Sequence, residues 1–147
     1  MEKKMEKEFR DYSLFVARVI MGLIFATAGT IKISDPFAFA EIISRYKILP
    51  EYLINDVAFF LPYLELFIAS MFFSGLFIKG ASILSFAILI TFTGALIYNI
   101  SRGINISCGC FTSTIEQVTD IHQIYYIIRD IIFISINFYI VKNVFRD

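Results

Sequence analysis

ASILSFAILITFTGALIYNI, residues 81–100, is a continuous apolar run that contains no charged side chain. A helix that crosses a bilayer needs about 20 mostly apolar residues, so this segment is long enough to span a membrane. Three further segments have the same character, although each carries one or two charged side chains: residues 12–31, 57–78 and 121–141. We therefore predict an all-α membrane protein, a four-helix transmembrane bundle formed by one domain of residues 1–147.

The composition agrees with this prediction. Of the 147 residues, 58% are hydrophobic and 18% are charged, whereas soluble domains average about 45–50% apolar and about 25% charged residues. The mean hydropathy is +0.73, which disfavours a free cytosolic enzyme and makes membrane lipid the expected surroundings. The 13 Lys and Arg residues balance 13 Asp and Glu residues. Because no basic surplus exists to neutralise phosphates, we expect no nucleic-acid partner.

The residues between the first two predicted spans indicate an additional short helix. Asp35-Pro36 ends one helix and allows another to begin, since proline is tolerated in a first helical turn. Apolar side chains then recur at helical spacing until Pro50: Phe39, Ile42, Ile43, Tyr46 and Leu49. This amphipathic pattern favours a helix that lies along the membrane interface in the first outer loop. The alternative is a plain connecting helix without membrane contact.

The distribution of Lys and Arg predicts the orientation of the spans. The side with four such residues carries Lys32, Arg45, Lys47 and Arg102. The side with seven holds both termini and carries Lys3, Lys4, Lys7, Arg10, Lys79, Lys142 and Arg146. We therefore expect cytoplasmic N and C termini and a multi-pass protein of the cell (inner) membrane. Lys79-Gly80 is predicted to form the tight turn between the second and third spans.

One face of the first span collects its charged and small residues. Arg18, Gly22, Phe25, Gly29 and Lys32 follow one another at spacings of four and three, which places them on a single helical seam. Glycine allows a neighbouring backbone to approach closely, so we expect this seam to point into the bundle.

Charged side chains on the second and fourth spans require partners, because a charge at mid-bilayer costs about 2.5–3.5 kcal/mol. At 1.5 Å per residue, Glu65 and the Arg129-Asp130 pair lie at similar depths. We predict an ion pair between Glu65 and Arg129, with Lys32 above it at the outer rim. This polar cluster is either a structural clamp, with Arg18 and Lys32 reaching to the interfaces, or a polar pocket that opens outward. Such a pocket would relay protons or bind a carbonyl-bearing lipid such as a quinone near Lys32, Glu65 and Arg129.

Cys108-Gly109-Cys110 lies between the third and fourth spans, on the predicted outer side. Cysteines there meet oxidising conditions, and a strained disulfide between them would be readily exchanged. Gly109 gives the backbone the freedom that ring closure requires, and a nearby Arg102 favours the reactive thiolate. Cys108 and Cys110 are therefore candidates for a redox pair. The alternatives are two thiols without chemistry, or a metal site with His122, which lacks the fourth ligand that structural zinc requires.

Several motifs follow one another in a fixed order: the Arg18–Lys32 seam, Asp35-Pro36, Tyr46-x3-Pro50, Pro62-x2-Glu65, Asn99-x2-Arg102-Gly103 and Cys108-Gly109-Cys110-Phe111. Together they resemble the DoxX/MauE-type membrane proteins over residues 18–130. The Cys-x-Cys-Phe element is more similar to the MauE (methylamine-utilisation) branch, although Thr112 stands where members of that branch often have glycine.

The resemblance implies a four-span inner-membrane protein that helps to mature a periplasmic methylamine dehydrogenase, with the dehydrogenase subunit or a thioredoxin-like protein as its partner. The DoxX relatives imply quinone-linked sulfur chemistry. In the mechanism we expect, Cys108 and Cys110 exchange a disulfide with the partner, and electrons pass to a quinone near the polar cluster. The chain has no second cysteine pair, so its status as an enzyme stays open. The alternative is a non-catalytic membrane anchor or assembly subunit of a quinone-linked redox complex.

Overall fold

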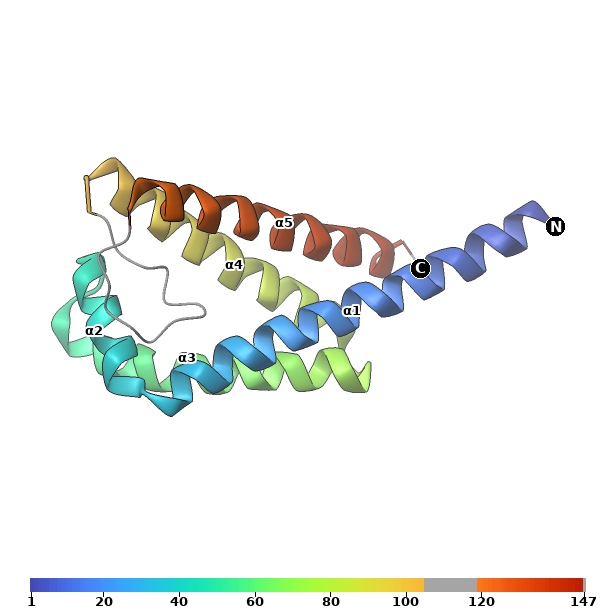
Figure 1. The fold of residues 1–147 in the computed structure, drawn as a ribbon. Coiled ribbons are helices and arrows are strands. Elements are labelled where there is room, and N and C mark those ends of the chain that lie inside the picture. Colours follow the sequence, from blue (N-terminus) through green and yellow to red (C-terminus); the bar gives the residue numbers. More distant parts are fainter. Residues whose placement is uncertain (105–118, 147) are drawn as a thin grey trace.

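The computed structural model describes residues 1–104 and 119–146, and the regular structure in these ranges is entirely helical (Figure 1). The helices are α1 (Glu2–Ser34), α2 (Pro36–Tyr46), α3 (Glu51–Ser74), α4 (Ile78–Ser101) and α5 (Asp120–Val144). Helices α1, α3, α4 and α5 are each long and apolar enough to cross a membrane. The predicted all-α, four-span, multi-pass architecture is confirmed.

The four long helices form two pairs, in which α1 packs along α3 and α4 packs along α5. Contacts of α1 with α5 and of α3 with α4 join the pairs. Figure 1 shows α2 at the end of the bundle where α1 finishes, and the N-terminus together with the end of α5 at the opposite end. Helix α1 begins well before the predicted span, and its charged first turns project beyond the other helices.

The predicted seam of α1 is the surface that packs against α3. Its members are buried apart from Arg18, which is half-buried. A Cβ atom on Gly29 would lie 2.9 Å from the carbonyl oxygen of Pro62, and one on Gly22 would lie 3.0 Å from the ring of Phe73. The two glycines therefore allow a close approach of the helices, as small residues do in membrane bundles.

A buried polar contact joins α4 to α5. Asn137 of α5 is completely buried. In the amide orientation that satisfies its surroundings, its nitrogen donates to the carbonyl oxygen of Ser82 at 3.1 Å, and its oxygen accepts from the hydroxyl of Ser85 at 2.6 Å. In lipid, where water offers no alternative partner, such side chains hold helices together.

The turn between α3 and α4 lies earlier in the chain than the sequence predicts. Helix α3 ends at Ser74, Gly75 follows with a φ of 75°, and α4 begins at Ile78. The predicted turn at Lys79-Gly80 is therefore wrong, because apolar residues after Gly75 extend the hydropathy signal past the true helix end. Glycine is the residue that most readily adopts the left-handed conformation that ends a helix.

The short helix between the first two spans is confirmed as α2. The carboxylate of Asp35 accepts a hydrogen bond from the backbone N–H of Ala38 at 3.0 Å and caps its N-terminus. Helix α2 ends with Lys47 in the left-handed conformation, before the proline that was predicted to stop it. Helix α2 packs on α3, and three of its apolar side chains are buried: Phe39, Ile42 and Tyr46. Its position along a membrane interface stays a prediction.

Candidate functional site

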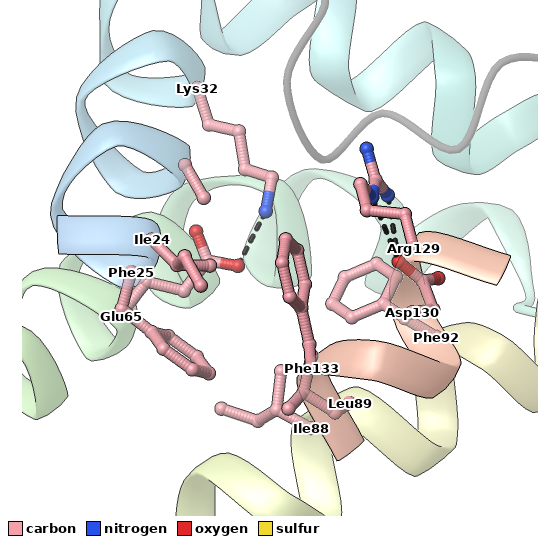
Figure 2. Close-up of a pocket in the computed structure, with 11 residues that line it drawn as sticks. Ile24, Phe25, Lys32, Glu65, Ile88, Leu89, Phe92, Arg129, Asp130 and Phe133 are labelled. Carbon is pink, nitrogen blue, oxygen red and sulfur yellow. Dashed lines mark hydrogen bonds and ion pairs between the residues drawn. The ribbon is translucent and has the colours of Figure 1, made fainter. Parts of the chain in front are cut away.

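A buried ion pair joins α1 to α3 (Figure 2). The Nζ of Lys32 donates to Oε1 of Glu65, and the two side chains are 2% and 3% exposed. The Lys32 ammonium also lies 5.1 Å from the ring centroids of both Phe39 and Phe92, a distance at which aromatic faces attract a cation. The other carboxylate oxygen, Oε2 of Glu65, is buried without a hydrogen-bond partner.

A second ion pair lies within α5. The guanidinium of Arg129 donates to Oδ1 of Asp130 from Nη2 at 2.8 Å and from Nε at 3.1 Å. Its central carbon lies 5.2 Å from the ring centroid of Tyr126 and 5.6 Å from that of Phe133. Asp130 is only 3% exposed, so this pair too is largely withdrawn from solvent.

Both ion pairs line one small cavity among the four long helices. Figure 2 shows the rings of Phe92 and Phe133 between the Lys32–Glu65 pair and the Arg129–Asp130 pair. The cavity has a volume of about 30 Å³, which exceeds the roughly 10–15 Å³ that one water molecule needs. Four of the side chains predicted to form a polar cluster thus line one cavity: Lys32, Glu65, Arg129 and Asp130.

The predicted ion pair between Glu65 and Arg129 is nevertheless wrong. Glu65 is bound by Lys32, and both side chains are buried. The physical reason is helix adjacency: α1 packs directly along α3, whereas the depth calculation says nothing about which helices are neighbours.

Arg18 does not join this cluster. Its Nη2 donates to the carbonyl oxygen of Phe72 at 3.1 Å, near the end of α3. A Cβ atom on Gly75 would lie 2.5 Å from the same nitrogen. Arg18 thus binds the final turn of α3, where carbonyl groups lack helical partners. Arg18 therefore links α1 to α3 at the end of the bundle opposite α2.

A larger cavity that the sequence did not reveal lies between α2, α3 and α4. Its volume is about 250 Å³ and its lining is almost wholly apolar. Phe92 and Ile88 line this cavity and the small one as well, so the two are neighbours. The sequence signal that could have indicated it is the apolar face of α2, which supplies much of the wall.

Several buried polar groups in the described part of the chain have no hydrogen-bond partner, which is uncommon in proteins. Besides Oε2 of Glu65 and Nε of Arg18, they are the hydroxyl of Thr93, the side-chain amide of Asn99 and Nε2 of Gln123. Asn99 lies near the end of α4 and Gln123 near the start of α5. These groups retain hydrogen-bonding capacity for a ligand or for water.

Cys108 and Cys110 lie outside the described residues. The helices on either side show where the segment that carries them is attached: α4 ends and α5 begins at the end of the bundle that holds α2 (Figure 1). His122 is exposed, and its Nδ1 lies 2.7 Å from the hydroxyl of Thr119. Within residues 1–104 and 119–146 no three His, Cys, Asp or Glu side chains converge as a metal site. The metal site of Cys108, Cys110 and His122 is therefore untested.

Comparison with known proteins relates the chain to one family. The family model described as methylamine utilisation protein MauE matches residues 10–142. The chain is 29% identical over 105 residues to the methylamine utilization protein MauE of Paracoccus denitrificans, covering 71% of this chain and 56% of that protein. It is 34% identical over 100 residues to the protein of that name from Methylophilus methylotrophus, covering 67% and 50%. The chain thus spans about half the length of these relatives. No solved structure matches significantly.

Proposed function

Since the chain belongs to the MauE family, we propose that it acts in methylamine utilisation as a membrane component of extracytoplasmic thiol–disulfide metabolism. Its role is to support the maturation of a periplasmic methylamine dehydrogenase, directly or through a thioredoxin-like partner. The observation that carries the proposal is the place of Cys108-Gly109-Cys110 in the chain. The segment that carries the cysteines joins α4 to α5 at the end of the bundle where α1 finishes. The buried Lys32 lies at this same end, two residues before the last residue of α1.

The reaction we propose begins with a disulfide between Cys108 and Cys110. The partner's two thiols exchange with this disulfide, so that the partner gains a disulfide and Cys108 and Cys110 become thiols. A quinone dissolved in the membrane then accepts two electrons and two protons from the two thiols. Quinol leaves, and the Cys108–Cys110 disulfide is restored. This reaction requires that the termini of the chain be cytoplasmic and that the cysteine segment lie outside the inner membrane.

The ion pairs support the quinone step because they supply polar groups in an apolar bundle. Lys32 provides a hydrogen-bond donor, and Oε2 of Glu65 is a buried acceptor without a partner. Arg129 and Asp130, which line the same cavity, add a second polar pair beside this site.

The test is to trap the thiols of Cys108 and Cys110 in intact cells with a membrane-impermeant, mass-tagged alkylating reagent, with and without prior reduction. A mixed population whose labelling rises on reduction is expected. Cys108→Ser and Cys110→Ser should each abolish oxidation of the partner, whereas Ser107→Ala, in the same segment, should not. Two permanently free thiols that do not respond to oxidant would overturn the proposal.

The second candidate is a non-catalytic anchor or assembly subunit. It is favoured by the mutual neutralisation of Lys32 with Glu65 and of Arg129 with Asp130, which suits a clamp that fixes helix register. A double-mutant cycle separates the two functions. If Lys32 and Glu65 are strongly coupled in stability while partner oxidation survives the loss of both, the clamp is their role.

A further inference from the structure

We propose that the apolar cavity between α2, α3 and α4 binds the ring of a neutral, membrane-dissolved lipid, and that a carbonyl or hydroxyl group on this ring is bound by the Lys32–Glu65 ion pair. The inference rests on the proposed function only for its choice of probe, a substituted benzoquinone. It specifies where the ligand binds, which kind of ligand binds there, and that α2 forms part of the cavity wall, none of which the proposed function specifies.

The size and lining of the cavity define the apolar part of the ligand. A cavity of about 150 Å³ lined by apolar side chains holds benzene, so a volume of about 250 Å³ has room for a six-membered ring with substituents. Apolar walls exclude a charged head group, because burying an unpaired charge is strongly unfavourable. A ring that carries no net charge is therefore the occupant that fits.

The ion pair defines the polar part of the ligand. Phe39 and Phe92 line the cavity and also face the Lys32 ammonium, so the cavity and the ion pair share these two rings. An ammonium has three N–H donors, yet the described hydrogen bonding of Lys32 consists of its single bond to Glu65. A carbonyl oxygen would accept from a remaining N–H, and a ring hydroxyl would donate to Oε2 of Glu65.

The same two groups explain why a neutral ring is preferred to an ion. Lys32 is already neutralised by Glu65, so an anion would meet the unpaired carboxylate oxygen and a cation would meet the ammonium. Phe92 lines both cavities. Under this proposal, the carbonyl or hydroxyl group reaches the ion pair when the Phe92 ring moves and joins the two cavities.

The sequence contains no tryptophan, so a single introduced indole reports on the cavity without background. Thr91→Trp places it on the exposed rim, and Ile90→Trp is the matched control, since Ile90 is the preceding residue of α4, 47% exposed, and does not line the cavity. The probe is decylubiquinone, titrated into each variant reconstituted in lipid vesicles. We expect saturable quenching of the Thr91→Trp indole and non-saturable, collisional quenching of the Ile90→Trp indole.

Two further variants test the assignment in the Thr91→Trp background. Ala95→Phe fills the cavity and should remove the saturable component. Lys32→Met combined with Glu65→Met removes both charges and avoids an unpaired buried ion. It should weaken binding by about ten- to hundredfold, the range expected for a lost hydrogen bond to a charged group. Saturable quenching that is unchanged in both variants would overturn the proposal.

An acyl chain of the bilayer is the competing occupant. Phospholipids brominated on their acyl chains also quench indole, so strong quenching of Thr91→Trp by them, together with a non-saturable response to decylubiquinone, would show that an acyl chain fills the cavity and would overturn the proposal. Non-saturable quenching in both tryptophan variants would do the same. Cys108→Ser/Cys110→Ser should leave quinone binding intact, so the loss of thiol chemistry and the loss of the binding site are separate results.

Discussion

The substitution Gly29→Ala measures how closely α1 and α3 approach each other. The new Cβ would lie 2.9 Å from the backbone carbonyl oxygen of Pro62 and 3.0 Å from Cγ of Leu66. Because the first of these atoms belongs to the backbone, no side-chain rotation relieves the contact, and the helices must move apart. Overpacking of this kind costs about 1–3 kcal/mol.

A matched glycine separates this steric cost from the change in helix propensity. Replacing glycine by alanine inside a helix gains about 0.8–1.0 kcal/mol, and Gly94→Ala on α4 receives that gain alone, since no neighbouring atom lies within 4 Å of its Cβ position. The difference in unfolding free energy between the two variants is therefore about 1–3 kcal/mol, with Gly29→Ala the less stable. Gly22→Ala should lie between them, because it meets only the ring of Phe73, which is half exposed and can move.

The assay is reversible unfolding in mixed micelles, in which the fraction of SDS is raised and the loss of helix is followed by circular dichroism. All three glycine variants and the unsubstituted chain are compared under identical conditions. Equal unfolding free energies for Gly29→Ala and Gly94→Ala would refute the close packing of α1 on α3.

The same titration tests three other features. Lys32→Met should lower the unfolding free energy by about 3–5 kcal/mol because Glu65 loses its partner. Lys32→Met/Glu65→Met should recover most of this loss. A double variant as unstable as Lys32→Met would contradict the conclusion that the loss comes from an unpaired Glu65. Gly75→Ala should cost about 1–2 kcal/mol, since the φ of 75° disfavours a side chain. The added cost of Arg18→Ala should then be smaller than in the unsubstituted chain, because both changes affect one contact. Asn137→Leu should cost about 0.6 kcal/mol and at most about 1.7 kcal/mol, the range for hydrogen bonds between membrane helices, and no change would argue against its contact with α4.

The seam of α1 shows which parts of the fold are predictable from sequence. Spacings of four and three place Gly22, Gly29 and Lys32 on one face whatever surrounds the helix, and this face is the one buried against α3. Periodicity is a property of one helix, so the seam, α2 and the four spans follow from the residues alone. The choice of partner for Glu65 is a property of three helices together, and depth arithmetic could not distinguish Lys32 from Arg129.

Two other features depend on interactions that hydropathy does not measure. The turn at Gly75 is set by backbone conformation and by the contact with Arg18, while Leu76 and Phe77 after it are apolar and read as a continued span. The cavity bordered by α2 arises from a mismatch between three packed surfaces, and no single segment encodes its volume. The available sequence signal for the turn was a glycine before an apolar run, since glycine readily adopts the left-handed conformation.

The Lys32–Glu65 ion pair also has a consequence for biosynthesis. Its members lie 33 residues apart in the chain, and at about 5–20 residues per second the ribosome adds Glu65 roughly 2–7 s after Lys32. During that interval the lysine has no carboxylate partner on α3. Its position two residues before the end of α1 lets the long side chain reach the head-group region while it waits. We therefore expect the first span to reach its final depth together with α3, so that the two enter the bundle as a unit.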